Sequence, residues 1–193
     1  MGTCDWFNGN DLRRAYHEEW GTPCHDDQKL FEFLVLEIMQ CGLSFSLMLD
    51  RREAMRAALD QYDYRKIAKY NQNDFDRLMQ AEGMIHSSRK IQALITDALA
   101  YEKVIAEFVS FDQYLWQYTD GQSLVYESHL KEVPATNELA QKLSKDLKKR
   151  GFKFVGPVVM YSYLQACGLI NDHDADCPRR EYLIEHYPSE VVE

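Results

Sequence analysis

The chain has 193 residues, with 31 acidic against 22 basic side chains and a net charge of −9. This length suits one domain or two closely packed lobes with a substantial core. The acidic balance argues against a protein that coats nucleic acid without specificity. No apolar run approaches the about 20 residues of a membrane span, and no signal-peptide pattern opens the chain. With five cysteines, an odd number, the sequence predicts a reduced, cytoplasmic protein without a membrane partner.

Capping signals predict a series of short helices in chain order. Ser, Thr, Asp or Asn precedes most apolar-periodic segments, and Gly or Pro follows several of them. The expected helices start at Asn10 or Asp11, Asp26, Ser44, Asp63, Asn73, Ser87 or Ser88, Ser110, Thr136 and Gly156. Residues 120–134 are the least regular and can hold an extended piece. Without a repeat or a sustained period-two alternation, the sequence predicts an all-α fold with nine or ten helices.

A basic helix that runs into a glycine-bounded turn is the most informative segment. Between Lys142 and Lys153, six cations stand against one acid. A Gly ends the first helix and a Pro begins the second, here Gly151 and Pro157. The free backbone N–H groups of such a turn, with Lys153 beside them, suit a phosphate. A like-charge run is by default a solvated helix face, but its place beside this hairpin indicates contact with DNA.

Glu37 is the second strong signal, because residues 30–39 leave the helix that carries it almost no polar face. A buried carboxylate must be paired, protonated or functional. The common interpretation is an ion pair or a hydrogen bond to a neighbouring helix end. The alternative is a carboxylate that lines a pocket and accepts hydrogen bonds from a ligand. Gly42 then ends the helix and presents Leu43 at a bend, where it is a weak candidate for a wedge into DNA.

Four side chains have the residue types of a tetrahedral zinc site: Cys4, His17, His173 and Cys177. The spacing alone is weak, because the four come from both chain ends and lack a compact C-x2-C motif. A lone His or Cys is more often structural. A metal held by all four would join the termini and leave no open position for water, which makes the predicted site structural.

Aromatic side chains cluster in the same part of the chain. Trp6, Tyr16 and Trp20 fall within the first twenty residues, and Phe45 follows the Glu37 helix. Each of these rings taken alone is more often a core residue. Together, and beside Cys4 and His17, they indicate a pocket that stacks against a flat ligand.

A set of motifs spread over residues 3 to 177 identifies the family that this chain resembles. They are C-D-W at 4–6, A-Y-H at 15–17, E-W-G at 19–21, K-L-F-E at 29–32, Q-C-G-L-S at 40–44, L-S-K-D-L-K-K-R-G-F-K-F-V-G-P at 143–157, Y-S-Y-L-Q-A-C-G-L at 161–169 and N-D-H-x3-C at 171–177. With Glu37, they resemble the 3-methyladenine DNA glycosylase I family of the helix-hairpin-helix glycosylase superfamily. The hairpin segment and N-D-H are the most specific parts.

The resemblance implies a helix-hairpin-helix glycosylase-like helical bundle in residues 1–177, followed by a C-terminal extension, residues 178–193. It implies one structural Zn²⁺ held by Cys4, His17, His173 and Cys177. Glu37 would hydrogen-bond the alkylated adenine, which would stack between Tyr16 and Phe45. The implied base pocket consists of Glu37, Trp6, Tyr16, Trp20, Phe45 and Ser162. The implied DNA contacts are Gly42, Leu43, Lys149, Arg150, Gly151, Lys153 and Gly156.

The activity implied is that of a monomeric, monofunctional glycosylase. It would hydrolyse the N-glycosidic bond of alkylated purines, above all 3-methyladenine, in double-stranded DNA and release the free base. A lyase activity needs an amine nucleophile, and residues 157–170 contain no lysine. Met39, Phe45 and Arg13 depart from the residues usual in the family. The altered pocket motivates an alternative, a zinc-containing DNA-binding or damage-recognition protein with weakened or absent catalysis.

Overall fold

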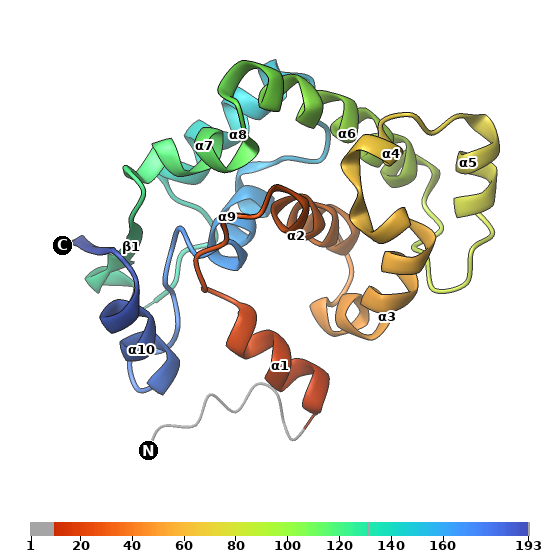
Figure 1. Cartoon of the computed structure of the whole chain (residues 1–193). Coiled ribbons are helices and arrows are strands. Elements are labelled where there is room, and N and C mark those ends of the chain that lie inside the picture. Colours follow the sequence, from red (N-terminus) through yellow and green to blue (C-terminus); the bar gives the residue numbers. More distant parts are fainter. Residues whose placement is uncertain (1–9, 131, 193) are drawn as a thin grey trace.

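The computed structural model describes residues 10–130 and 132–192, which are predominantly helical (Figure 1). The first three helices are α1 (Asp11–Glu19), α2 (Asp27–Gln40) and α3 (Phe45–Ala58). Each begins at the expected capping residue, because the side chains of Asn10, Asp26 and Ser44 accept a hydrogen bond from a backbone N–H of the first turn.

The remaining helices are α4 (Tyr64–Ile67), α5 (Gln72–Leu78), α6 (Ser88–Phe108), α7 (Phe111–Trp116), α8 (Glu138–Lys149), α9 (Pro157–Ala166) and α10 (Pro178–His186). Two of them begin at other residues than expected. Asn71, not Asn73, caps α5 because it forms a capping box with Asp74. Asn137, not Thr136, caps α8, in line with the stronger capping preference of Asn. None of the helices in the described ranges is long and apolar enough to cross a membrane.

A two-stranded parallel sheet accompanies the helices, so the fold is predominantly helical, as expected, with two short strands in addition. Strand β1 (Ser123–Tyr126) lies in the irregular region, and β2 (Ser189–Val192) lies in the C-terminal extension. Their register runs from Ser123 opposite Ser189 to Tyr126 opposite Val192. Each strand has four residues, which is too short for an alternation of apolar and polar side chains to be recognised in the sequence. The two paired strands also lie far apart in the sequence.

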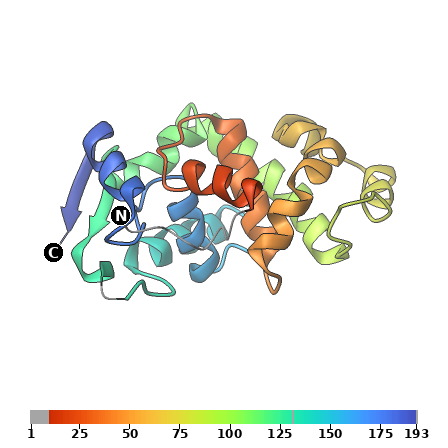
Figure 2. The same cartoon turned by 90° about the horizontal axis from the view of Figure 1, so that it is seen from below.

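The C-terminal extension therefore packs against the rest of the chain. Helix α10 and β1 lie side by side in both views (Figures 1 and 2). The buried Arg180 of α10 donates through Nη1 to the backbone carbonyls of Asn171, at 3.3 Å, and His173, at 3.1 Å. The side-chain amide of Asn171 donates back to the carbonyl of Arg180, at 3.2 Å. The extension is thus tied to the segment that precedes it.

Helix α2 lies at the centre of the molecule, with the other helices around it (Figure 1). Ten of its fourteen residues are buried, as expected for a helix that is apolar almost all round. Two of the ten, Glu32 and Glu37, are acidic. Glu32 is paired with arginine side chains, whereas Glu37 lines a cavity.

Candidate active site

A cavity of about 370 Å³ opens beside the second half of α2, within the range of pockets that bind small ligands. Its walls come from α1, α2, α3, α9 and the segment before α10. The lining residues are Tyr16, His17, Trp20, Glu37, Gln40, Phe45, Ser162, Gln165, Asp172, His173 and Asp174. The fold thus brings together Glu37 and four of the five expected base-contacting residues. The fifth, Trp6, lies outside the described residues.

Glu37 is buried and unpaired. Its side chain is 5% exposed, and no described residue forms a hydrogen bond or an ion pair with its carboxyl group. Burial raises the pKa of this carboxyl from 4.5 to about 8. The common interpretation of a buried carboxylate, an ion pair, therefore does not apply. A carboxyl group left unpaired at the wall of a cavity is available to a ligand.

Tyr16 and Phe45 form an aromatic wall of the cavity. Their ring centroids lie 4.8 Å apart, with an angle of 46° between the rings. A base between two rings would need a separation of about 7 Å, twice the contact distance of about 3.5 Å. The two rings are therefore in contact with each other in this structure, and the stacking of a base between them stays a prediction. Trp20 is the C-cap residue of α1. Its ring lies edge-to-face with the ring of His173, with 4.7 Å between the ring centroids.

Asp172 also lines the cavity, but its carboxylate is already engaged. It accepts hydrogen bonds from the Tyr161 hydroxyl at 2.5 Å and the Gln165 amide at 2.8 Å, and His129 Nδ1 lies 2.7 Å from it. These contacts distinguish Asp172 from Glu37. Sequence reasoning missed Gln165, although its spacing from Ser162 places both on one face of a helix. Nothing in the sequence indicates His129.

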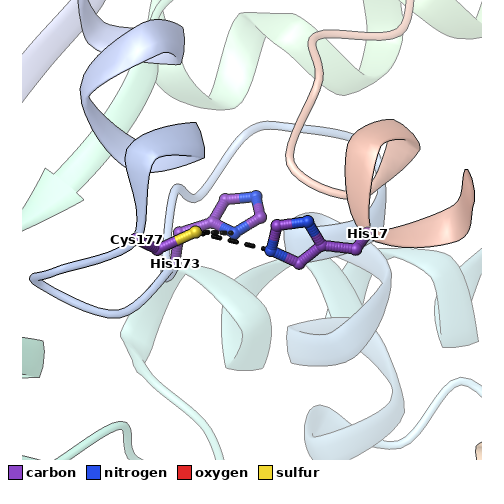
Figure 3. A group of neighbouring side chains, drawn as sticks. All are labelled: His17, His173 and Cys177. Atoms are coloured by element: carbon purple, nitrogen blue, oxygen red, sulfur yellow. Dashed lines mark hydrogen bonds between the residues drawn. The ribbon is translucent and has the colours of Figure 1, made fainter. Parts of the chain in front are cut away.

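Three of the four expected metal ligands lie together (Figure 3). The sulfur of Cys177 is 3.4 Å from His17 Nε2 and 3.7 Å from His173 Nδ1, and the ligand atoms of the three lie within 4.8 Å of one another. His17 comes from α1, whereas the other two flank the loop before α10. The second ring nitrogen of His173 lies 3.0 Å from the carbonyl of Trp20. Cys4 lies outside the described residues.

The two nitrogens of His173 have different roles in this arrangement. A contact between Nε2 and a backbone carbonyl fixes the ring and leaves Nδ1 free as a ligand. Burial lowers the pKa of His173 to about 4, so the ring is neutral at physiological pH, as a metal ligand must be. The cluster can therefore hold a metal ion.

The turn between α8 and α9 has the expected punctuation, with Gly151 at φ 98° and Pro157 at the start of α9. Phe154 also adopts a positive φ, 55°, and is 38% exposed. The backbone N–H of Lys153 donates to Asp97 Oδ1 at 2.7 Å, which ties the turn to α6. The side chains of Lys149 and Lys153 are exposed. Both cations are accessible to a charged partner.

Arg150 differs from these lysines, because it is engaged within the protein. Its guanidinium contacts Asp146 and Glu107, each at 2.7 Å. It also lies over the rings of Phe108, at 4.9 Å, and Tyr114, at 5.1 Å. A side chain held by two carboxylates and two rings is a structural element of this surface.

Comparison with known proteins decides the family. The methyladenine glycosylase family model matches residues 6–180 of the chain. DNA-3-methyladenine glycosylase 1 of Escherichia coli (strain K12) is 42% identical over 179 residues, 92% of this chain and 96% of the relative. The chain belongs to the methyladenine glycosylase family.

Solved structures of the family share the fold of this methyladenine glycosylase family member. A tyrosine-to-phenylalanine variant of 3-methyladenine DNA glycosylase I in complex with 3-methyladenine has a TM-score of 0.87 at 35% identity, covering 93% of this chain and 98% of that one. The Staphylococcus aureus 3-methyladenine DNA glycosylase I has a TM-score of 0.86 at 36% identity, covering 92% and 95%.

In this family member a buried lysine closes the helix that carries Glu37. Lys90 Nζ donates to the backbone carbonyls of Met39, at 2.8 Å, and Cys41, at 2.6 Å, and so satisfies the carbonyls at the end of α2. Gly42 follows with φ 78°. Leu43 is then 39% exposed at the bend. The sequence predicted the bend through Gly42 but gave no indication of Lys90.

Proposed function

We propose that this protein is a monofunctional DNA-3-methyladenine glycosylase that acts in base-excision repair. The single observation that carries the proposal is the unpaired, buried carboxyl of Glu37 at a cavity with an aromatic wall, in a chain of this family. The substrate is double-stranded DNA with an alkylated purine, and the products are free 3-methyladenine and an abasic site. The protein acts as a monomer.

The chemistry follows from the charge of the lesion. An adenine alkylated at N3 is a cation in DNA and leaves as a neutral base, so its glycosidic bond needs little acid catalysis. The enzyme flips the nucleotide into the cavity, where Tyr16 and Phe45 offer an aromatic surface that favours a cation. The lesion lowers the pKa of Glu37 and favours its ionised form. The carboxylate accepts hydrogen bonds from the base edge and stabilises positive charge that develops on the sugar.

Water completes the hydrolysis. The electron pair of the bond between the sugar carbon and the base departs with the base, which thereby becomes neutral. Water adds to the sugar carbon and loses a proton to solvent, which leaves the abasic site. No lysine lies in residues 157–170 to form a Schiff base, so the strand stays intact.

The direct test is the release of base from methylated duplex DNA. The protein is incubated with duplex treated with a methylating agent, and free 3-methyladenine is separated and quantified. Unmethylated duplex is the control. Release of 3-methyladenine without strand cleavage is the expected result. Binding of the duplex without release would instead favour the catalytically inactive damage-recognition protein.

A structural Zn²⁺ is part of the proposal, with Cys4, His17, His173 and Cys177 as ligands. Zinc bonds of about 2.3 Å to sulfur and about 2.0 Å to nitrogen in a tetrahedron place sulfur and nitrogen about 3.5 Å apart. The separations of 3.4 and 3.7 Å around Cys177 support such a site. Bound zinc would hold α1 against the loop before α10.

The zinc proposal predicts that Cys177→Ser loses about one equivalent of bound metal. Because binding to the folded state stabilises it, a loss of about 2 kcal/mol would lower Tm by about 4–8 °C. Metal content by mass spectrometry and a thermal melt measure both effects. Cys24→Ser, at a half-buried thiol outside the cluster, is the matched control. Equal metal content in both variants would contradict the site.

The hairpin is proposed to hold the DNA backbone through Lys149 and Lys153, with the backbone of Gly151 and Gly156 close to the phosphates. Gly42 and Leu43 are proposed to fill the space left by the flipped nucleotide. We interpret Arg150 as a support of this surface, because its guanidinium is bound by two carboxylates and lies against two rings.

The hairpin proposal predicts a change in the salt dependence of DNA binding. Lys149→Gln with Lys153→Gln removes two phosphate contacts, so the slope of log K against log salt should fall by about 2. Titrations of duplex at several salt concentrations measure the slope. Lys66→Gln with Lys69→Gln changes the net charge equally at exposed positions elsewhere and is the control. If both double variants changed the slope equally, the result would contradict a specific contact between the hairpin lysines and the DNA phosphates.

A further inference from the structure

A charged network lies behind the aromatic wall of the cavity. Arg52 follows Phe45 by about two turns of α3, so both side chains lie on the same face of that helix. The Arg52 guanidinium lies 5.7 Å from the centroid of the Tyr16 ring. Phe45 contacts the same ring at 4.8 Å. Arg52 is not among the residues that line the cavity, so it contacts Tyr16 from outside.

The Arg52 guanidinium is held in one orientation. Its two terminal nitrogens donate to the two carboxylate oxygens of Glu19, at 2.6 and 2.9 Å. Its Nε donates to Glu32 at 2.7 Å, and Glu32 is only 2% exposed. A planar guanidinium with three such bonds cannot turn without breaking them. Its position over Tyr16 is therefore fixed by α1 and α2 together.

The same network contains a second arginine that serves as an internal comparison. Arg56 also bonds Glu32, at 2.5 Å, but its guanidinium lies 5.4 Å from the ring of Tyr62. Tyr62 is buried in the core and does not line the cavity. Arg52 and Arg56 thus share a buried carboxylate, and they differ in the tyrosine ring over which the guanidinium lies. The Tyr62 hydroxyl also donates to the backbone carbonyl of Arg52, at 3.2 Å, a bond that does not involve the Arg52 side chain.

We propose that Arg52, held by Glu19 and Glu32, is a positioning residue that fixes the Tyr16 ring as the stacking surface for the flipped base. This inference rests on the proposed function, because it assigns a role to the network through the base cavity. Glu19 also binds Lys29, at 2.5 Å, and Glu32 binds Lys29, at 3.1 Å, and Arg56. The two carboxylates therefore hold Arg52 within a larger charged network.

The test compares Arg52→Lys with Arg56→Lys. Lysine keeps the positive charge at each position but loses the planar fork. Arg52→Lys is expected to raise the dissociation constant of free 3-methyladenine by up to about tenfold, the value of one aromatic contact, and to lower kcat/KM on methylated duplex at least as much. Arg56→Lys should change the dissociation constant and kcat/KM by less than about twofold. The two variants should lower Tm by similar amounts.

A spectroscopic measurement reports on the ring itself. In protein labelled with ¹³C-tyrosine, the ring signals of Tyr16 are assigned by their loss in Tyr16→Phe. Arg52→Lys should shift the Tyr16 signals more than those of Tyr62, whose hydroxyl bonds only the backbone of residue 52. Arg56→Lys should shift the Tyr62 signals more than those of Tyr16. If Arg52→Lys does not fold, Glu19→Gln removes one side of the bidentate pair and is measured in the same way.

Two results would overturn the proposal. One is a Tyr16 spectrum that does not change in either Arg52→Lys or Glu19→Gln. The other is an equal loss of base affinity in Arg52→Lys and Arg56→Lys, which would show a general effect on stability. Failure of the proposed function looks different. The wild-type protein would then neither bind nor release 3-methyladenine, while the ring signals would still decide whether Arg52 positions Tyr16.

Discussion

Glu37→Gln is expected to lower the rate of 3-methyladenine release by about 100- to 1000-fold, the usual effect of removing one preorganised electrostatic group. Glutamine has nearly the same size and retains an oxygen that accepts hydrogen bonds, so the cavity stays intact. It lacks the negative charge that stabilises the developing cation. Single-turnover release from methylated duplex measures the effect on the chemical step without a contribution from product release.

The control is the same change at Glu53, which is 77% exposed on α3 and should leave the rate unaltered. Duplex affinity should be unchanged in both variants, because Glu37 lies within the cavity and away from the hairpin cations. A Glu37→Gln rate within about threefold of wild type would contradict the role of the carboxylate, since catalytic electrostatic groups contribute far more.

At pH 9 the Glu37→Gln variant is expected to be more stable than the wild type by up to about 5 kcal/mol. The carboxyl has a pKa of about 8 in the folded protein, raised by burial from 4.5. Between these values the unfolded chain is ionised while the folded protein retains its proton. Stability associated with Glu37 is therefore fully present below pH 4.5 and is lost progressively as the pH rises through 8. Glutamine does not titrate and avoids this loss.

Urea unfolding of both proteins at pH 4.5, 7 and 9 measures the difference. The difference in free energy of unfolding between the variant and the wild type should be constant at acidic pH. It should rise by about 1.4 kcal/mol per pH unit between pH 4.5 and 8 and level off above pH 8. Asp97, whose pKa burial also raises to about 8, contributes equally to both proteins and cancels. A difference that does not vary with pH would show that the carboxyl is solvated or paired in the folded state.

The helices and Glu37 could be predicted because their signals are local. A capping side chain such as Asp26 acts within one turn, and the apolar neighbours of Glu37 surround it on its own helix. The cavity residues were predicted through motifs rather than through geometry. The motifs therefore predicted that Tyr16 and Phe45 contact a base, but they did not indicate that the two rings contact each other.

The features that could not be predicted depend on contacts between distant segments. Arg52 and Glu19 read as ordinary surface charges until α1 and α3 are placed side by side. Lys90 caps α2 from another helix, and no local pattern distinguishes it from a solvated lysine. The pairing of β1 with β2 joins two four-residue segments. One lies in the irregular region and the other near the C-terminus, and neither carries a local strand signal.

The hydrogen bonds of Arg180 give the C-terminal tail a structural consequence for protein engineering. A truncated chain that ended at residue 177 would retain every predicted site residue, yet the backbone that carries His173 would lose its anchor on α10. The tail therefore supports the segment that carries Asn171 and His173. Trimming it would remove this support together with the buried Leu183, and affinity tags are better separated from Val192 by a spacer.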